Sequence, residues 1–291
     1  MQPQDAERDA VRRMPGVGPA ARIADVDSGW TSRVYVVDDG RLVVKFPRRE
    51  AVRSEYAREV AVLQRLAAHR GDLPPDVVLP QVTDVGEDHA YLAYQGVVGL
   101  PLDDPRARLD PAAGARVGAA LGRFLTVLHA LDLPAMPVLT VEDEIAQFQG
   151  QHAEAREVLA AALSAAECDA LEVLVHETLP RTLRELGGDP ALCHGDLGPW
   201  NLILTPDGRV GVIDFGDVGS WDRSKDFMGL PDGVVEAALQ AYGGGRGEAL
   251  EVKVEHRRIV LALLDLPYFA GTGNAAGVER TVARIRAALA P

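Results

Sequence analysis

One stretch, residues 192–215, limits what this chain can fold into more than any other part of the sequence. It reads LCHGDLGPWNLILTPDGRVGVIDF, a polar loop followed by two short apolar runs with a Pro-Asp-Gly turn between them. Apolar runs around such a turn predict a β-hairpin with strands at 202–204 and 210–213. The hairpin would place Asn201, at the start of its first strand, next to Asp214, at the end of its second.

The polar residues of this stretch suit the binding of a metal ion. Glycine and proline around Asp196 favour an irregular loop, and Asn201 follows five residues later in the same loop. Together with Asp214 these residues offer an amide oxygen and two carboxylates. Such a set suits Mg²⁺, a hard cation that prefers oxygen ligands and leaves room for substrate phosphates. We therefore predict a magnesium site formed by Asn201 and Asp214.

The spacing of the same residues matches that of a kinase. In the protein-kinase template a loop Asp accepts the proton of the acceptor hydroxyl, an Asn five residues later binds metal, and the Asp of an Asp-Phe-Gly triplet also binds metal. Asp196, Asn201 and Asp214 have this spacing, although the loop opens His-Gly-Asp instead of His-Arg-Asp. HGDxxxxN followed by IDFGD resembles the aminoglycoside phosphotransferases and their kinase-like relatives. The alternative is an ordinary polar loop and hairpin, which the occurrence of both motifs at this separation disfavours.

Composition limits the partners of the chain. Its 291 residues, 47% of them hydrophobic and 25% charged, indicate a soluble globular protein that can fill more than one typical lobe or domain. A formal net charge of −13 argues against a nucleic-acid partner, because neutralising phosphates requires clustered Lys and Arg. The charge is compatible with a cationic substrate, although a role in solubility alone would also explain it.

Cysteine usage and the N-terminus bear on the compartment. The two cysteines, Cys168 and Cys193, fit neither a disulfide framework nor a metal-binding spacing, and we expect Cys193 to be a small buried hydrophobe. The N-terminus lacks the apolar stretch of a signal peptide, and no run approaches the roughly 18 apolar residues of a membrane span. We therefore expect a cytoplasmic monomer without a membrane partner.

The N-terminal third predicts a sheet. Strands at 23–27, 34–37 and 42–46 are separated by a small-residue loop and an Asp-Gly turn. The loop offers backbone N–H and hydroxyl donors that suit phosphates, from Ser28, Gly29, Thr31 and Ser32. It contains neither a Walker A nor a GxGxxG pattern, so by itself it predicts only a hairpin turn.

Lys45 lies late in the third of these strands, where a kinase places the Lys that reaches the α- and β-phosphates. Apolar spacing predicts a helix over 49–68, with Glu59 on the flank of its apolar face. A carboxylate there can pair with Lys45. Glu55, about one turn earlier, is the competing candidate. Glu59 is preferred because the family's pattern is an Arg-Glu pair ahead of an apolar-rich helix end.

Strands are also predicted at 81–86 and 89–94, and the run 91–102 resembles the hinge of the 2''-acting branch of the aminoglycoside kinases. This resemblance implies that the backbone from Gln95 to Val97 binds the purine edge of ATP or GTP. It also places Tyr94 at the back of the base pocket, where a large residue could favour guanine. The boundary between the N-lobe (1–96) and the C-lobe (97–291) is expected here.

The rest of the chain predicts helices, at 116–131, two or three within 141–186, and at 233–242, 248–264 and 275–289. Helices inserted before the catalytic loop are where small-molecule kinases build their acceptor site, so Glu154 in the acidic segment is a candidate acceptor contact. A solvated helix face is an equally good interpretation.

Further residues take roles from the resemblance to the family. Asp217, just after the Asp-Phe-Gly triplet, is a candidate contact for a substrate cation. His194 is expected to support the catalytic loop. Asp226 is expected to brace the same loop from below.

Together these observations predict an α+β, two-lobed, protein-kinase-like fold, with an antiparallel-sheet N-lobe and a mainly helical C-lobe. The resemblance implies a kinase that transfers the γ-phosphoryl group of a nucleoside triphosphate to an aminoglycoside hydroxyl, with Asp196 as the base. A macrolide or another small alcohol is the alternative acceptor. A non-catalytic pseudokinase is the alternative of another class.

Overall fold

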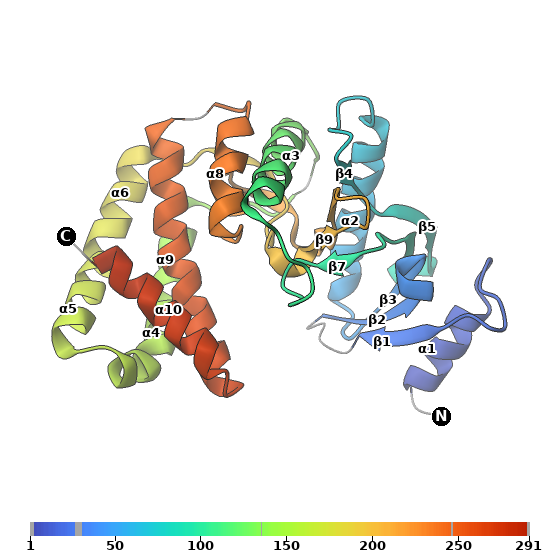
Figure 1. The fold of residues 1–291 in the computed structure, drawn as a ribbon, viewed down its shortest axis with the longest axis horizontal. Coiled ribbons are helices and arrows are strands. Elements are labelled where there is room, and N and C mark those ends of the chain that lie inside the picture. The colour runs from blue at the N-terminus through green and yellow to red at the C-terminus, as the bar shows by residue number, and fades with distance from the viewer. Residues whose placement is uncertain (1–2, 27–30, 135, 246, 290–291) are drawn as a thin grey trace.

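The computed structural model describes residues 3–26, 31–134, 136–245 and 247–289. A sheet-rich N-terminal part and a mainly helical C-terminal part lie next to each other along the long axis of the molecule (Figure 1). The two ends of the chain lie in different parts, the N-terminus beside the sheet and the C-terminus beside the helices (Figure 1).

Five antiparallel strands form the N-terminal sheet, in the order β1-β2-β3-β6-β5. Their bounds are β1 (Ile23–Val26), β2 (Ser32–Val37), β3 (Leu42–Pro47), β5 (Gln81–Val85) and β6 (Leu92–Gln95). The strand prediction for 89–91 was wrong. Asp88 and His89 have positive φ angles of 49° and 56°, which place a turn there instead.

One long helix, α2 (Val52–Ala68), packs on this sheet. Its first turns contact the sheet through Val52 and Tyr56, which cluster with Leu92 and Tyr94, whereas its last turns enter the core of the C-terminal part. A short helix, α1 (Pro3–Arg12), packs on the sheet residues Tyr35 and Val37 through Val11. Helix α2 therefore belongs to the cores of both parts.

The predicted hairpin is present as β9 (Leu202–Leu204) and β10 (Val210–Val212), paired antiparallel. It lies in the middle of a four-stranded sheet in the order β4-β10-β9-β7, in which β4 (Val77–Val78) pairs parallel with β10, and β7 (Leu100–Pro101) pairs with β9. This sheet connects the N-terminal part to the candidate catalytic hairpin. The lobe boundary between residues 96 and 97 stays a prediction.

The C-terminal part is built from helices around two cores. The helices are α3 (Pro111–His129), α4 (Val141–Ala162), α5 (Ala165–Val173), α6 (Leu179–Leu186), α7 (Lys225–Met228), α8 (Asp232–Ala241), α9 (Glu248–Gly271) and α10 (Ala275–Leu289). One core lies between α3, α8 and the hairpin, and the other lies between α4, α5, α6, α9 and α10. None of the helices in the described ranges has the combination of length and apolarity that crossing a bilayer requires.

Two helix ends show how local chemistry sets the boundaries. Helix α3 begins five residues before the predicted start, because the Asp110 side chain accepts a hydrogen bond from the Ala113 amide at 2.7 Å and Pro111 suits the first turn. Helices α5 and α6 are joined without a break by a π-helical turn, Leu174–Thr178. Pro180 has no N–H to donate and crowds the carbonyl four residues earlier, which explains the wider turn.

The pair of strands β8 (Pro190–Cys193) and β11 (Gly219–Asp222) was not predicted. It aligns the segment before the catalytic loop with the segment after the Asp-Phe-Gly triplet, so that both ends of the candidate site are held together. Cys193 lies in this pair and is fully buried, as expected.

Helices α3 and α8 approach closely at Gly122, and this contact provides a test of the packing. A Cβ atom at Gly122 would collide with the backbone carbonyl of Ala238. We expect Gly122→Ala to lower the free energy of unfolding by about 1–3 kcal/mol, as overpacked sites do. Gly150→Ala, in α4 with open space around it, should raise the free energy by up to about 1 kcal/mol, since alanine favours helix. Urea unfolding of both variants measures the change in the free energy of unfolding. Equal changes in the two variants would contradict the close contact at Gly122.

Candidate active site

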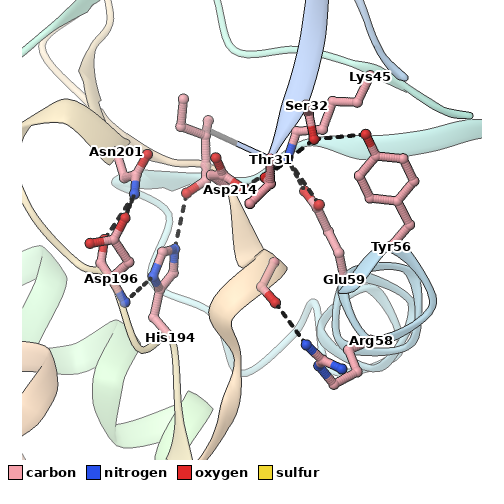
Figure 2. A network of polar contacts seen from close by, with 12 residues as sticks. Thr31, Ser32, Lys45, Tyr56, Arg58, Glu59, His194, Asp196, Asn201 and Asp214 are labelled. Atoms are coloured by element: carbon pink, nitrogen blue, oxygen red, sulfur yellow. Dashed lines mark hydrogen bonds and ion pairs between the residues drawn. The ribbon is translucent and has the colours of Figure 1, made fainter. Parts of the chain in front are cut away.

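The catalytic-loop motif and the hairpin bring the predicted residues together. The amide nitrogen of the Asn201 side chain donates to Asp196, to the backbone oxygen at 2.8 Å and to Oδ2 at 2.9 Å. The backbone N–H of Ile213 donates to the Asn201 carbonyl at 3.1 Å, so the next residue, Asp214, lies beside the loop, as Figure 2 shows. The predicted proximity of Asp196, Asn201 and Asp214 is observed.

Asp196 is oriented from two sides. Besides Asn201, the indole N–H of Trp200 donates to its Oδ2 at 3.1 Å. Burial raises the pKa of the Asp196 carboxyl above its ordinary value, although the bond from Trp200 opposes the rise. A carboxylate with a raised pKa accepts a proton more readily than an ordinary one.

Gly195 explains why this loop opens His-Gly-Asp. Its φ is 88°, a conformation that favours glycine, and a Cβ atom there would collide with the carbonyl of Asp217. An arginine at this position, as in the protein-kinase template, would not fit this backbone.

His194 connects the loop to the end of the hairpin. Its Nε2 lies 2.9 Å from the Ile213 carbonyl, and its Nδ1 lies 3.3 Å from the Asp196 amide nitrogen (Figure 2). Because the carbonyl can only accept and the amide can only donate, Nε2 carries the proton. The ring also packs on Phe215, with centroids 4.7 Å apart.

Asp226 binds the loop from its other side. Its fully buried carboxylate accepts hydrogen bonds from the backbone amides of His194, at 2.8 Å, and Gly195, at 2.9 Å. His129 of α3 lies 3.0 Å from the same carboxylate and 2.9 Å from the Tyr242 hydroxyl. Burial alone would raise the pKa of Asp226, but the hydrogen bonds from His129 and the loop amides bring it below its ordinary value.

Lys45 is held by two carboxylates. Its Nζ lies 2.9 and 3.1 Å from the Glu59 oxygens and 2.8 Å from Asp214 Oδ1 (Figure 2). Burial alone would lower the pKa of Lys45, but Asp214 and Glu59 raise it well above its ordinary value, so the ammonium stays charged. In the described part of the chain, no ion pair joins Lys45 to the competing candidate Glu55.

A small cavity opens above this lysine. Its lining is Thr31, Ser32, Lys45, Glu55, Tyr56, Glu59, Asp214, Gly216 and Asp217. The Tyr56 hydroxyl donates to the Ser32 side chain at 2.7 Å, which fixes this end of the predicted phosphate loop. The other two predicted loop residues, Ser28 and Gly29, lie outside the described residues.

One of the predicted hinge residues, Tyr94, lies near the same lysine. Tyr94 is buried, and the Lys45 ammonium lies 5.8 Å from the centre of its ring. Gln95 is the exposed last residue of β6, and Val97 packs against Gly211 of β10. The purine contact of this segment stays a prediction.

A second cavity of about 340 Å³ lies between the catalytic loop, α4 and α9. Its lining includes Asp196, Trp200, Asp217, Trp221, Lys225 and Asp265, with an apolar wall of Val260, Leu261 and Leu264. Asp217, just after the Asp-Phe-Gly triplet, borders both cavities, so they lie close together. This arrangement offers a charged cavity at Lys45, a carboxylate at Asp196 and a separate second cavity beside it.

Glu154 is absent from the lining of this cavity, so nothing in the structure supports the acceptor contact predicted for it. The α4 residues in the lining are Glu144, Gln147, Phe148 and Gln151. Helix α4 runs on past the cavity, and Glu154, about one turn beyond Gln151, is exposed. The interpretation of this residue as part of a solvated helix face fits the structure better.

A sequence profile of the phosphotransferase enzyme family matches residues 22–259. This chain belongs to that family. The match covers the sheet, the hairpin and the first half of α9, and it confirms the predicted relationship to the kinase-like antibiotic phosphotransferases. No curated protein sequence is significantly similar to this phosphotransferase.

Solved structures with the same fold cover nearly the whole phosphotransferase chain. The GDP and kanamycin complex of APH(2'')-IIIa is 18% identical, with 97% of each chain covered and a TM-score of 0.71. Macrolide 2'-phosphotransferase MphH from Brachybacterium faecium is 23% identical, with 97% of this chain and 98% of that one covered and a TM-score of 0.64. These likenesses confirm the predicted two-lobed α+β fold. The 2''-acting branch stays a prediction.

Sequence reasoning missed the network of buried charges that reaches the second cavity. Arg257 donates to Glu144 at 2.7 Å and to Ser224 at 2.6 Å, and Lys253 donates to Asp222 at 2.7 Å. The available signal was helical spacing, because Lys253 and Arg257 occupy positions four apart on the buried face of α9.

The Lys45 pair can be tested with two matched substitutions in α2. We expect Glu59→Gln to lower the free energy of unfolding by about 3 kcal/mol, because it leaves a buried ammonium with one carboxylate fewer. It should also reduce kcat/KM by at least about tenfold, since each 1.4 kcal/mol in the transition state is a factor of ten. Glu55→Gln is the control and should change both quantities much less. A similar loss in both variants would show that Glu59 has no special role.

Asp226 predicts a pH dependence of stability. Because its folded pKa is lowered, its stabilising effect is complete above the ordinary Asp pKa of about 3.9 and is lost as pH falls through the folded value. Asp226→Asn should therefore be less stable than the wild type at neutral pH, and the gap should narrow towards about pH 3. Urea unfolding across this range measures the gap. Asp169→Asn, an exposed change in α5, is the control, and a gap for Asp226→Asn that is constant with pH would contradict the prediction.

Proposed function

We propose that this phosphotransferase is a small-molecule kinase that transfers the γ-phosphoryl group of ATP or GTP to a hydroxyl of an aminoglycoside. The observation that carries the proposal is the position of Asp196. Asp196 lines the second cavity, which would hold the acceptor, and this cavity shares Asp217 with the one that contains Lys45 and Asp214. A hydroxyl and a phosphate could therefore meet at Asp196.

The donor side of the reaction would use the charged pocket of the N-terminal part. Lys45 would bind the phosphates, and Glu59 would keep its ammonium in place. Thr31 and Ser32 line the same cavity and would donate to phosphate oxygens. The hinge, from Tyr94 to Val97, would contact the base. The solved structures support a nucleotide donor, since they include GDP and ATP complexes.

The oxygen donors near Asp214 fit Mg²⁺. The nitrogen of the Asn201 side chain is committed to Asp196, so the carbonyl oxygen of the same side chain is left to bind a cation. With Asp214 it would hold Mg²⁺, which when bound neutralises charge on the transferring phosphoryl group. Asp214 also accepts a hydrogen bond from Lys45, so a metal ion would compete with Lys45 for this carboxylate. Glu59 would then hold Lys45 independently of the metal site.

Asp196 would act as the base. Trp200 and Asn201 orient its carboxylate, and its raised pKa favours acceptance of the proton from the acceptor hydroxyl. Positioning between the two cavities would supply much of the acceleration, because phosphoryl transfer requires little covalent help from the protein.

The charge of the acceptor cavity favours an amine-bearing substrate. Asp196, Asp217 and Asp265 contribute three carboxylates, while the buried Glu144 is neutralised by Arg257. Lys225 is the cation that opposes them, and its ammonium lies 5.4 Å from the centre of the Trp221 ring. This excess of carboxylates supports a polyamine such as an aminoglycoside.

The apolar wall of the same cavity favours a second candidate acceptor. Val260, Leu261 and Leu264 of α9 line one side, and Trp200 is partly exposed near them in the cavity lining. A macrolide, which combines an amino sugar with a large apolar ring, would use such a wall. One of the structures with this fold is a macrolide phosphotransferase.

The proposal is tested by incubating the purified chain with Mg²⁺ and ATP or GTP against a panel of aminoglycosides and macrolides, followed by mass spectrometry. We expect one added phosphoryl group on an aminoglycoside. Asp196→Asn should reduce kcat by about 100-fold or more, because it removes the base. Asp217→Asn should mainly raise KM for the cationic acceptor.

The outcomes separate the candidates. A phosphorylated macrolide would retain the mechanism and replace the acceptor. Nucleotide binding without product from any acceptor, including other small alcohols, would contradict the kinase proposal and support a pseudokinase.

A further inference from the structure

A second group of metal-ligating side chains lies far from the catalytic loop, in the helices at the end of the molecule opposite the N-terminal sheet (Figure 1). His152 comes from α4, Glu172 from α5 and His176 from the π-helical turn that follows α5. One ligand atom of each lies within 4.8 Å of the others. The cluster has no part in the proposed kinase mechanism.

The distances within the cluster match those of a small tetrahedral metal site. Nδ1 of His152 and Nε2 of His176 are 3.3 Å apart, and the Glu172 oxygens lie 3.7 Å from the first nitrogen and 3.6 Å from the second. Two ligands bound at about 2.0–2.1 Å in tetrahedral geometry are separated by about 3.3 Å. The nitrogens already have this separation. The two Glu172 distances end on different oxygens, Oε2 near His152 and Oε1 near His176, so the carboxylate has to turn to place one oxygen, or both, on the ion.

The surroundings allow the ion to enter and keep the ligands in place. His152 is 4% exposed, and its ring lies edge-on to that of His176, with centroids 5.4 Å apart. The His176 and Glu172 side chains are 35% and 50% exposed, so the cluster opens to solvent. Arg156 lies 3.7 Å from Glu172, but its side chain is 68% exposed and free to turn away when a cation takes its place.

We propose that His152, Glu172 and His176 form a binding site for a divalent transition-metal ion of the Zn²⁺ type. Two imidazole nitrogens and one carboxylate are a donor set that Zn²⁺ takes, with a fourth position left for water. The site joins α4 to the continuous helix formed by α5 and α6. Because Gln147 and Gln151 of α4 line the acceptor cavity, the bound ion stabilises the helix that forms one wall of that cavity.

An alternative without metal is a single hydrogen bond between the two imidazole rings, with Glu172 paired to Arg156. The two interpretations differ in what removal of one exposed ligand does. Without a metal, loss of His176 would remove only one hydrogen bond. If the cluster binds a metal ion, the same loss would abolish the affinity for that ion.

The test is a titration of the full-length chain with Co²⁺ and with Zn²⁺, in the absence of nucleotide. We expect the wild type to bind one equivalent more than His176→Ala and Glu172→Gln. The additional Co²⁺ should show the intense visible absorption of four-coordinate geometry, and Zn²⁺ should raise the Tm of the wild type alone among these three. The comparison counts only this site, because the variants keep Asn201 and Asp214.

A matched control is available in His69→Ala. His69 lies 3.3 Å from Asp72 in an exposed pair without a second imidazole, so this variant should keep the additional equivalent. Equal stoichiometry in the wild type and His176→Ala, or loss of the equivalent in His69→Ala as well, would overturn the proposal. Circular dichroism checks that each variant is folded. The readout is metal binding, so the result is independent of kinase activity.

Discussion

A single buried carboxylate, Asp226, holds the elements of the candidate active site in position. It accepts from two amides of the catalytic loop and from His129 of α3, which also contacts Tyr242 after α8. A buried charge is stable only when its oxygens are satisfied in this way. The loop that carries Asp196 therefore depends on the packing of α3 against α8, although these helices contribute nothing to the chemistry.

A second set of contacts, made by Lys45, links the two parts of the molecule. Lys45 of β3 binds Glu59 of α2 within the N-terminal part and Asp214 of the hairpin in the C-terminal part. Helix α2 packs on the sheet at its first turns and in the C-terminal core at its last turns. A shift of α2 would therefore change the lysine proposed to bind phosphate and the candidate metal ligand together. This coupling makes a kinase site sensitive to residues that never touch a substrate.

Much of the candidate site could be predicted because its signals are local. The turn at 206–208 predicted the hairpin, and the Arg-Glu pair of the family's pattern favoured Glu59 over Glu55, in agreement with the ion pair. Other sequence signals were present but were weaker than the apolar spacing next to them. One is Asp110, the N-cap that makes α3 begin earlier than predicted. Glu154 was selected for its acidic surroundings, which say nothing about where a helix leaves a cavity. Local charge predicts exposure better than it predicts contact with a ligand.

The sequence by itself determined the hairpin, the spacing of Asp196, Asn201 and Asp214, and the strand that carries Lys45, because these depend on residues near one another in the chain. The tertiary structure alone decided the acceptor cavity and the Arg257–Glu144 pair, whose partners lie 113 residues apart. It also decided the proximity of His152 to Glu172 and His176. Such contacts depend on how helices pack, and packing is set by the whole core and not by any local pattern.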